Sequence, residues 1–151
     1  MKLDERYQKE AERDTEGVTR FLADLISMPS LSRDEHAVVQ RIGHEMTRVG
    51  FDEVTVDGFG SVIGRIGDGP VHIVYDSHLD MVDTGDLSMW KSDPFKARIE
   101  GGVMYGRGAS DNKGAIASMV YGASLVRRLG IDTSRFTLSG ARRARRRIAA
   151  W

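Results

Sequence analysis

Apolar residues recur at the spacing of an amphipathic helix in three stretches of the chain. The first covers residues 18–26 and the last covers residues 116–129, each with apolar side chains three or four positions apart. Between them, residues 39–49 repeat the pattern after Ser32 and Glu35, which have the spacing of a helix-capping box. Because this period matches the turn of an α-helix, the pattern predicts three helices, each with one buried side.

The segments between and after these helices change to patterns typical of strands. Residues 51–69 alternate and are interrupted by glycines, which predicts a hairpin. Residues 70–78, "PVHIVYDSH", form a nearly continuous apolar run that predicts a strand buried on both faces. Residues 97–106 predict a small hairpin, and residues 135–140 predict one last strand. Strands that alternate with helices in this way predict an α/β fold, with helices packed on a mixed sheet.

The composition is that of an ordinary globular domain and excludes several classes of protein. The chain of 151 residues contains no cysteine, which rules out a disulfide framework or a thiolate metal site and favours the cytoplasm. No apolar stretch approaches the roughly 20 residues of a membrane-spanning helix. The charged first residues lack the apolar core of a signal peptide. We therefore expect a cytoplasmic protein with no membrane partner.

The formal net charge is zero, but the charges are distributed unevenly. No acidic residue follows Asp132, and residues 141–151, "ARRARRRIAAW", carry five arginines, without which the net charge is −5. This asymmetry divides the chain into a charged N-terminal segment, 1–14, a domain, 15–140, and an Arg/Ala-rich tail, 141–151. We expect the tail to be disordered or loosely helical, because it offers nothing to bury.

His78 and Asp80 follow the long apolar run, at the carboxyl end of a predicted strand, where sites of α/β sheets lie. Residues two apart on an extended segment point to the same side. A metal-bound imidazole usually has its second ring nitrogen held by an acceptor such as a carboxylate. The pair therefore has the composition of a metal ligand and its orienting group. Taken alone, however, a His-x-Asp pair more often belongs to a surface turn.

A second candidate, Asp111, lies in the turn "YGRGASDNKGA", directly before the third predicted helix. The glycines of this turn allow tight backbone geometry. A carboxylate at such a strand-to-helix turn is able to bridge two metal ions with its two oxygens. The alternative is that Ser110 or Asp111 only caps the helix. The turn is not a phosphate-binding P-loop, because Lys113 precedes Gly114 and no Ser or Thr follows.

Taken together, these segments resemble the family of zinc-dependent peptidases and deacylases that includes glutamate carboxypeptidase, aminoacylase, acetylornithine deacetylase and succinyl-diaminopimelate desuccinylase. The resemblance rests on "LISMPSLS", "GFDEVTVDGFGSVIGRIG", "HLDMVDTGD" and "WKSDPFKARIEGGVMYGRGASDNKGAIASMVYGA". These segments are collinear over residues 18–138 and combine H-x-D with G-R-G-x-x-D-x-K-G, which is more specific than either motif alone. The form "YDSHLDMVDTGD" is similar to the branch of selenium-metabolism-linked hydrolases.

The resemblance implies the N-terminal portion of a zinc-exopeptidase-like catalytic domain, with a role for each candidate residue. His78 would ligate one zinc, Asp80 would act as the catalytic residue that holds its imidazole, and Asp111 would bridge two zincs. Asn112 would follow in an unusual backbone geometry. A complete site in the family holds two zincs, with cobalt or manganese as alternatives. It hydrolyses the amide or peptide bond of a small acylated amino acid or dipeptide, with a glutamate as general base.

The resemblance ends at Gly140. In the family, a Glu-Glu pair follows the corresponding strand and supplies the general base and a zinc ligand. Another acidic ligand, a final histidine and an inserted domain, through which members often form homodimers, come later. This chain reads "ARRARRRIAAW" instead. We therefore expect a truncated or frameshifted chain that binds zinc weakly, or not at all, and is inactive alone.

Two alternatives remain for the same observation. The chain is a non-catalytic fragment with a binding or regulatory role, or the five arginines of residues 141–151 contact the phosphates of a nucleic acid. The second alternative is the weaker one, because no nucleic-acid-binding fold or stacking surface accompanies the tail.

Overall fold

The computed structural model describes residues 3–143 and the side chains of residues 5–140. The helices are α1 (Leu3–Arg13), α2 (Thr15–Ser27), α3 (His36–Arg48) and α4 (Gly114–Arg128). The strands are β1 (Glu53–Val56), β2 (Val62–Ile66), β3 (Val71–His78), β4 (Arg98–Glu100), β5 (Val103–Tyr105) and β6 (Phe136–Arg143). Two short turns of other helix types are η1 (Leu87–Met89) and η2 (Ala109–Lys113). No helix in this part of the chain is long and apolar enough to cross a membrane.

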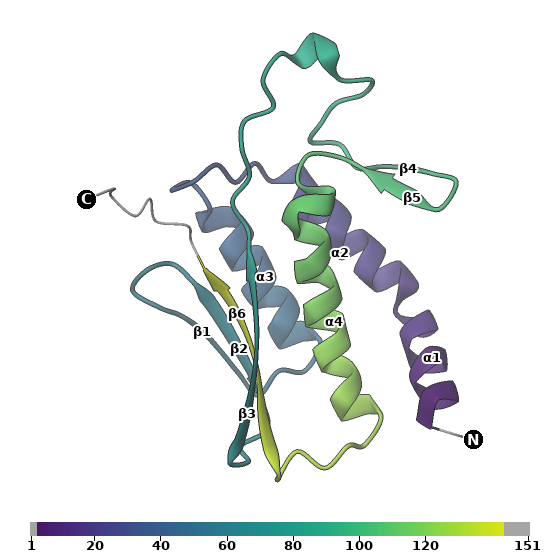
Figure 1. The fold of residues 1–151 in the computed structure, drawn as a ribbon, viewed down its shortest axis with the longest axis vertical. Coiled ribbons are helices and arrows are strands. Elements are labelled where there is room, and N and C mark those ends of the chain that lie inside the picture. The colour runs from purple at the N-terminus through teal and green to yellow at the C-terminus, as the bar shows by residue number, and fades with distance from the viewer. Residues whose placement is uncertain (1–2, 144–151) are drawn as a thin grey trace.

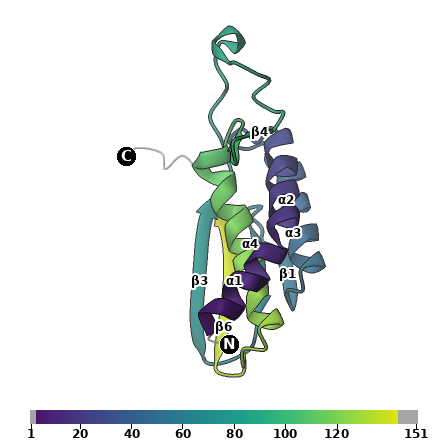
Figure 2. The same ribbon diagram turned by 90° about the vertical axis from the view of Figure 1, so that its right-hand side faces the viewer.

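A mixed sheet and the helices form two layers (Figure 1). The sheet has the order β1-β2-β6-β3, in which β3 and β6 run parallel and the other neighbours run antiparallel. Figure 2 shows β3 and β6 on one side of the molecule and the helices on the other. β4 and β5 form a separate hairpin. These layers confirm the predicted α/β fold with a mixed sheet.

The core lies between the helices and the inner face of the sheet. Each of the three predicted apolar stripes is buried there, which confirms the three predicted helices as α2, α3 and α4. The deepest side chains of these stripes are Phe21 and Leu25 on α2, Ile42 and Met46 on α3, and Ile116 and Val120 on α4. α4 connects β3 to β6, so its packing on both strands fixes the parallel pair.

One additional helix and one helix start differ from the sequence predictions. The charged segment 1–14 contains helix α1, which was not predicted because the segment has no apolar stripe. Arg128, at the end of α4, forms ion pairs with Glu10 of α1 and with Asp14 directly after it. The predicted capping box of Ser32 and Glu35 is wrong, because α3 begins at His36 and has no side-chain cap. The Ser32 hydroxyl instead donates to another partner, in the candidate site described below.

β3 also differs from its prediction as a strand buried on both faces. Every residue from Val71 to Asp76 is exposed, and Val74 keeps 65% of its surface accessible. The reason is topological: β3 lies at the edge of the sheet, and the helices cover only one face. A continuous apolar run predicts an interior strand because both faces then have neighbours. Within the described residues, the free edge and the outer face of β3 have none.

β6 continues three residues beyond the predicted strand at 135–140. Residues 141–143 still pair with β3, whereas the sequence places them at the start of a disordered tail. The remainder of that tail, 144–151, lies outside the described residues, and the predictions about it stay predictions.

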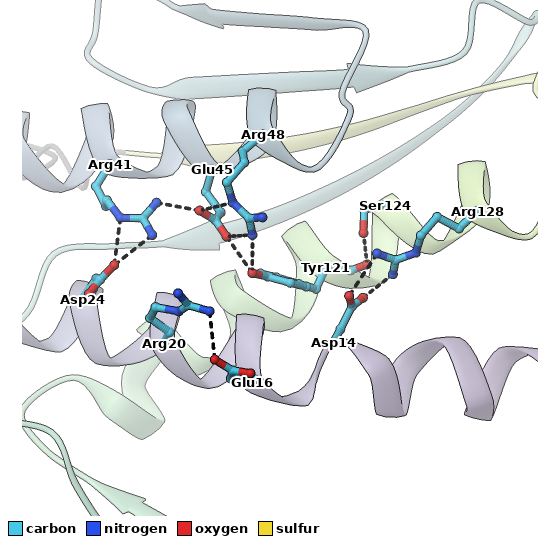
Figure 3. Close-up of polar contacts among 10 residues, drawn as sticks. All are labelled: Asp14, Glu16, Arg20, Asp24, Arg41, Glu45, Arg48, Tyr121, Ser124 and Arg128. Carbon is cyan, nitrogen blue, oxygen red and sulfur yellow. Dashed lines mark hydrogen bonds and ion pairs between the residues drawn. The ribbon is translucent and has the colours of Figure 1, made fainter.

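A buried glutamate on α3, Glu45, links three helices through polar contacts (Figure 3). Its carboxylate accepts hydrogen bonds from Arg41 at 2.8 Å, from Arg48 at 2.6 Å and from Tyr121 of α4 at 2.6 Å. Arg41 also donates to Asp24 of α2 at 2.9 Å. Burial alone would raise the pKa of Glu45, but these hydrogen bonds outweigh it and lower the pKa to about 2. The network therefore joins α3 to both neighbouring helices.

We predict that Glu45→Gln destabilises the fold by about 2 kcal/mol near neutral pH, because Arg41 and Arg48 lose their shared charged partner. The pKa of Glu45 in the folded chain lies below its ordinary value of 4.5. The stabilisation is therefore present above the ordinary value and is lost as the pH falls toward 2. Urea denaturation of both proteins across this pH range measures the difference.

The matched control is Glu53→Gln, because Glu53 forms an exposed ion pair with Arg65. Its removal should change the free energy of unfolding by less than about 1 kcal/mol. Equal losses in the two variants, or a Glu45→Gln loss that stays constant with pH, would contradict the role given to the network.

Candidate metal centre

The candidate site lies at the carboxyl end of β3, where three segments distant in sequence meet. β3 ends at His78 and continues into residues 79–81, which lie beside residues 30–32 after the end of α2. The turn of residues 108–114, which opens α4, forms the third side. The predicted glycine-bearing turn before the third helix is therefore confirmed, and it lies where the strand delivers its histidine.

The imidazole of His78 stands between the other two candidate residues. Its Nε2 atom lies 2.8 Å from Oδ1 of Asp111. On its other side, Nδ1 lies 3.6 Å from Oδ1 of Asp80 and 3.2 Å from the Asp80 carbonyl oxygen. The three residues that the sequence singles out, at positions 78, 80 and 111, thus form one contiguous group. Each ring nitrogen faces oxygen atoms, which is the arrangement of a ligand with an orienting partner behind it.

Asp80 is held in place from behind by the segment that follows α2. The Ser32 hydroxyl donates to Oδ2 of Asp80 at 2.7 Å. The backbone on either side is fixed as well, because the Ser30 hydroxyl donates to the Leu79 carbonyl and the Met81 amide donates to the Ser30 carbonyl, each at 2.8 Å. Asp80 is 8% exposed, and its Oδ1 atom has no hydrogen-bond partner in the described residues. That atom points to the imidazole of His78.

Asp111, in contrast, presents its carboxylate to solvent, with 86% of its side chain exposed. Gly108 begins the turn at a φ of 77°, which favours glycine, and the Asp111–Asn112 peptide bond is cis. The expected unusual backbone geometry at Asn112 is therefore present. The side-chain amide of Asn112 donates to the Ser77 hydroxyl at 2.9 Å, which connects the turn to β3. The exposed carboxylate is thus carried on a turn whose backbone is fixed.

A cleft of about 260 Å³ opens beside these residues. His78, Asp80 and Asp111 line one side, and Trp90 and Arg107 line another. The indole nitrogen of Trp90 donates to the Thr84 carbonyl at 3.0 Å, and Arg107 donates to the carbonyls of residues 82 and 83 at 2.9 Å and 2.8 Å. These contacts hold the loop after the site against the turn.

The donor atoms present fit one part of a metal site. His78 Nε2 and the Asp111 carboxylate converge, and the unsatisfied oxygen of Asp80 lies behind the ring. Imidazole and carboxylate are common ligands of zinc, but a catalytic zinc normally has three protein ligands. Within residues 3–143, no group of three or more His, Cys, Asp or Glu side chains could hold a metal ion. The described residues therefore supply part of a ligand set.

Solved structures share this fold at low sequence identity. The dipeptidase Dug1p from Saccharomyces cerevisiae superposes with a TM-score of 0.79 at 18% identity, over 92% of this chain and 34% of that one. Human carnosine dipeptidase 1 superposes with a TM-score of 0.76 at 20% identity, over 98% of this chain and 36% of that one. At these identities the likeness shows the fold alone, over about a third of each of those chains.

Sequence relatives are closer. Residues 74–140 match the model of peptidase family M20/M25/M40. The uncharacterized protein YgeY of Escherichia coli is 44% identical over 115 residues, which are 76% of this chain and 28% of YgeY. The succinyl-diaminopimelate desuccinylase of Afipia carboxidovorans is 39% identical over 101 residues, 62% of this chain and 26% of that enzyme. Residues 74–140 therefore carry part of the domain of peptidase family M20/M25/M40.

Two residues of the site have contacts that sequence reasoning missed. Ser32 has the spacing of a helix cap, so its hydrogen bond to Asp80, 48 positions away, had no local signal. Lys113 belongs to the G-R-G-x-x-D-x-K-G motif, but nothing in its spacing indicates that it is fully buried. Burial lowers the pKa of Lys113 to about 8. The motif itself was the available signal, since it includes a lysine two positions after Asp111.

We predict that Asp80→Ala lowers the affinity of the chain for Zn²⁺ by roughly 10-fold or more, because the imidazole of His78 loses the acceptor that orients it. Isothermal titration at millimolar zinc would measure this change. Asp83→Ala is the matched control, since Asp83 is an exposed acid of the same loop whose carboxylate, among the described residues, accepts hydrogen bonds from Thr84 and Gly85. Equal losses for the two variants would show that Asp80 has no special part in the site.

Proposed function

We propose that this chain carries part of the catalytic domain of a metal-dependent amide hydrolase. One observation carries the proposal: Nε2 of His78 and Oδ1 of Asp111 lie 2.8 Å apart at the end of β3, with the buried Asp80 behind the ring. Membership of a peptidase and deacylase family supports the same reaction class. The activity of the whole protein is part of this proposal, because the chain spans about a quarter of the relatives that it matches.

Each residue has a role in this proposal. His78 and Asp111 would hold the metal, and Asp80 would fix the ring of His78 so that Nε2 keeps its direction. A metal held there would supply Lewis-acid activation of the amide carbonyl and of a water nucleophile. The carboxylate of Asp111 suits a metal ligand, because 86% of the side chain is exposed and the residue lines the cleft. Cobalt or manganese are alternatives to zinc, since all three accept imidazole and carboxylate ligands.

The proposed substrate is a small acylated amino acid or a dipeptide. Support comes from the relatives, whose names describe a desuccinylase and dipeptidases. The products are a carboxylate and an amine. We also propose that the complete enzyme is a homodimer of the cytoplasm, on the resemblance and the absence of cysteine given above.

We further propose that the 151-residue chain binds metal weakly and turns over no substrate by itself. The residues at positions 78 and 111 supply two of the ligands that a dinuclear site needs, and the described part of the chain contains no third. The second candidate function, a non-catalytic binding or regulatory fragment, rests on this same observation. The hypothesis of a nucleic-acid-binding tail concerns residues 141–151, of which 144–151 lie outside the described residues.

The proposed catalytic role is tested with a chimera that joins residues 1–140 to the remainder of the Afipia desuccinylase. We predict about two zincs per chimera and hydrolysis of succinyl-diaminopimelate, both lost in His78→Ala and in Asp111→Ala. Inductively coupled plasma mass spectrometry measures the metal, and amine release measures the turnover. The control is Asp86→Ala, because Asp86 is an exposed acid whose carboxylate caps η1. Unchanged turnover in both site variants would contradict the proposed site.

The 151-residue chain alone separates the two candidate functions. We expect less than one zinc per chain after gel filtration and no amine release from the same substrate. Two tightly bound zincs per chain would contradict the account of an incomplete ligand set.

A further inference from the structure

Lys113 is a buried cation that the proposed chemistry does not use. Its side chain is 0% exposed, and its ammonium donates hydrogen bonds to the carbonyl oxygens of Leu25 and Met28, both at 2.8 Å. The Met81 sulfur lies 3.9 Å from the same nitrogen. Among the described residues, no carboxylate lies within ion-pair distance of Nζ. A lysine with only carbonyl and thioether partners in the interior is rare, since Lys is almost never fully buried unless it is paired with an opposite charge.

The end of α2 partly compensates for this charge. The last carbonyl groups of a helix have no partner within the helix and carry the negative end of its dipole. Lys113 donates to the Leu25 carbonyl in the last turn of α2 and to the carbonyl of Met28, the residue that follows the helix; the Leu25 carbonyl also accepts the Met28 amide at 3.3 Å. Burying the ammonium still costs free energy, and a methionine would fill a similar volume without that cost. Packing alone therefore does not explain why the buried side chain at position 113 is charged.

Lys113 also shapes the turn that carries Asp111. Its amide donates to the Gly108 carbonyl at 2.9 Å and so closes the turn. A Cβ atom on Gly108 would lie 3.3 Å from Cδ of Lys113, so the backbone of the turn packs closely against the lysine stem. The side chain of Lys113 is thus enclosed by the turn at one end and fastened to α2 at the other.

The segment after α2, to which Lys113 is hydrogen-bonded, also contacts residues 79–81 on the other side of the site. Met28 is two residues before Ser30 and four before Ser32, the two serines that fix the backbone and carboxylate of the 79–81 segment. Lys113 therefore connects the turn of Asp111 directly to the segment that orients Asp80.

We propose that Lys113 is a positioning residue, whose hydrogen bonds to the end of α2 set the place of the Asp111 carboxylate relative to His78. This inference rests on the proposed function, because positioning has a purpose only if the two residues bind a metal together. If Lys113 acts through Asp111, substituting Lys113 has no further effect on metal affinity in a variant whose residue 111 cannot bind the metal.

The test compares zinc affinities of the 151-residue chain, followed by NMR of the His78 ring, a readout that also tracks weak binding. Lys113→Met should weaken zinc binding by about 10-fold, as is typical when a group behind a ligand is removed. Asp111→Asn should weaken it as well, and the double variant should bind no more weakly than Asp111→Asn alone. Glu45→Gln is the matched control, because it removes another buried charge, away from the site, and should leave the affinity unchanged.

The absence of cysteine permits a second test that does not depend on the fold of Lys113→Met. Lys113→Cys is alkylated while unfolded and then refolded, either with 2-bromoethylamine, which restores an ammonium, or with 1-bromopropane, which gives an apolar chain of the same length. We expect the ammonium form to recover zinc affinity and the propyl form to stay about 10-fold weaker. If the propyl form does not refold while the ammonium form does and binds zinc as the unaltered chain does, the requirement for the charge is supported.

Three results would overturn the inference. Equal zinc affinity of the ammonium and propyl forms would show that the charge has no part in positioning. An affinity loss from Lys113→Met that adds fully to that of Asp111→Asn would show that the lysine does not act through Asp111. Unchanged affinity in Asp111→Asn would overturn the proposed metal site itself, and this outcome is distinct because it does not depend on any Lys113 variant.

Discussion

The parallel pairing of β3 with β6 is the constraint on which the rest of the site depends. Because α4 connects the two strands and packs against both, its N-terminus lies at the carboxyl end of β3. The strand delivers His78 at that end, and the turn before the helix delivers Asp111. Sites of α/β sheets lie at such ends for this reason. If the pairing shifted by one residue, the side chain of His78 would move to the other face of the sheet.

Three buried ionisable groups illustrate two different uses of polarity. Glu45 is surrounded by donors from two helices, which stabilises its charge and ties α3 to α2 and α4. Asp80 has one donor, from Ser32, and an oxygen that faces only the ring of His78. Lys113 has two carbonyl acceptors. Glu45 is fully hydrogen-bonded and paired with opposite charges, as is usual for a structural group. Asp80 and Lys113, beside the candidate metal ligands, have buried charges that their neighbours compensate only in part.

Much of this arrangement could be predicted from the sequence because its signals are local. The apolar period identifies α2, α3 and α4, and the paired motifs select His78, Asp80 and Asp111, which do lie together. The contacts that depend on distant segments could not be predicted. Ser32 reaches Asp80 across 48 positions, and the burial of Lys113 depends on the end of α2. The exposure of β3 follows from its place in the strand order, which no local pattern encodes. The assignment of metal to these residues stays a prediction.

The most direct measurement is anomalous diffraction at the zinc edge from crystals of this chain soaked in zinc. We predict a peak within about 2.0–2.2 Å of both Nε2 of His78 and a carboxylate oxygen of Asp111. The peak should be missing in crystals of His78→Ala. Peaks confined to other histidines or acids, with His78 and Asp111 still in direct contact, would contradict the claim that these two residues form part of a metal centre.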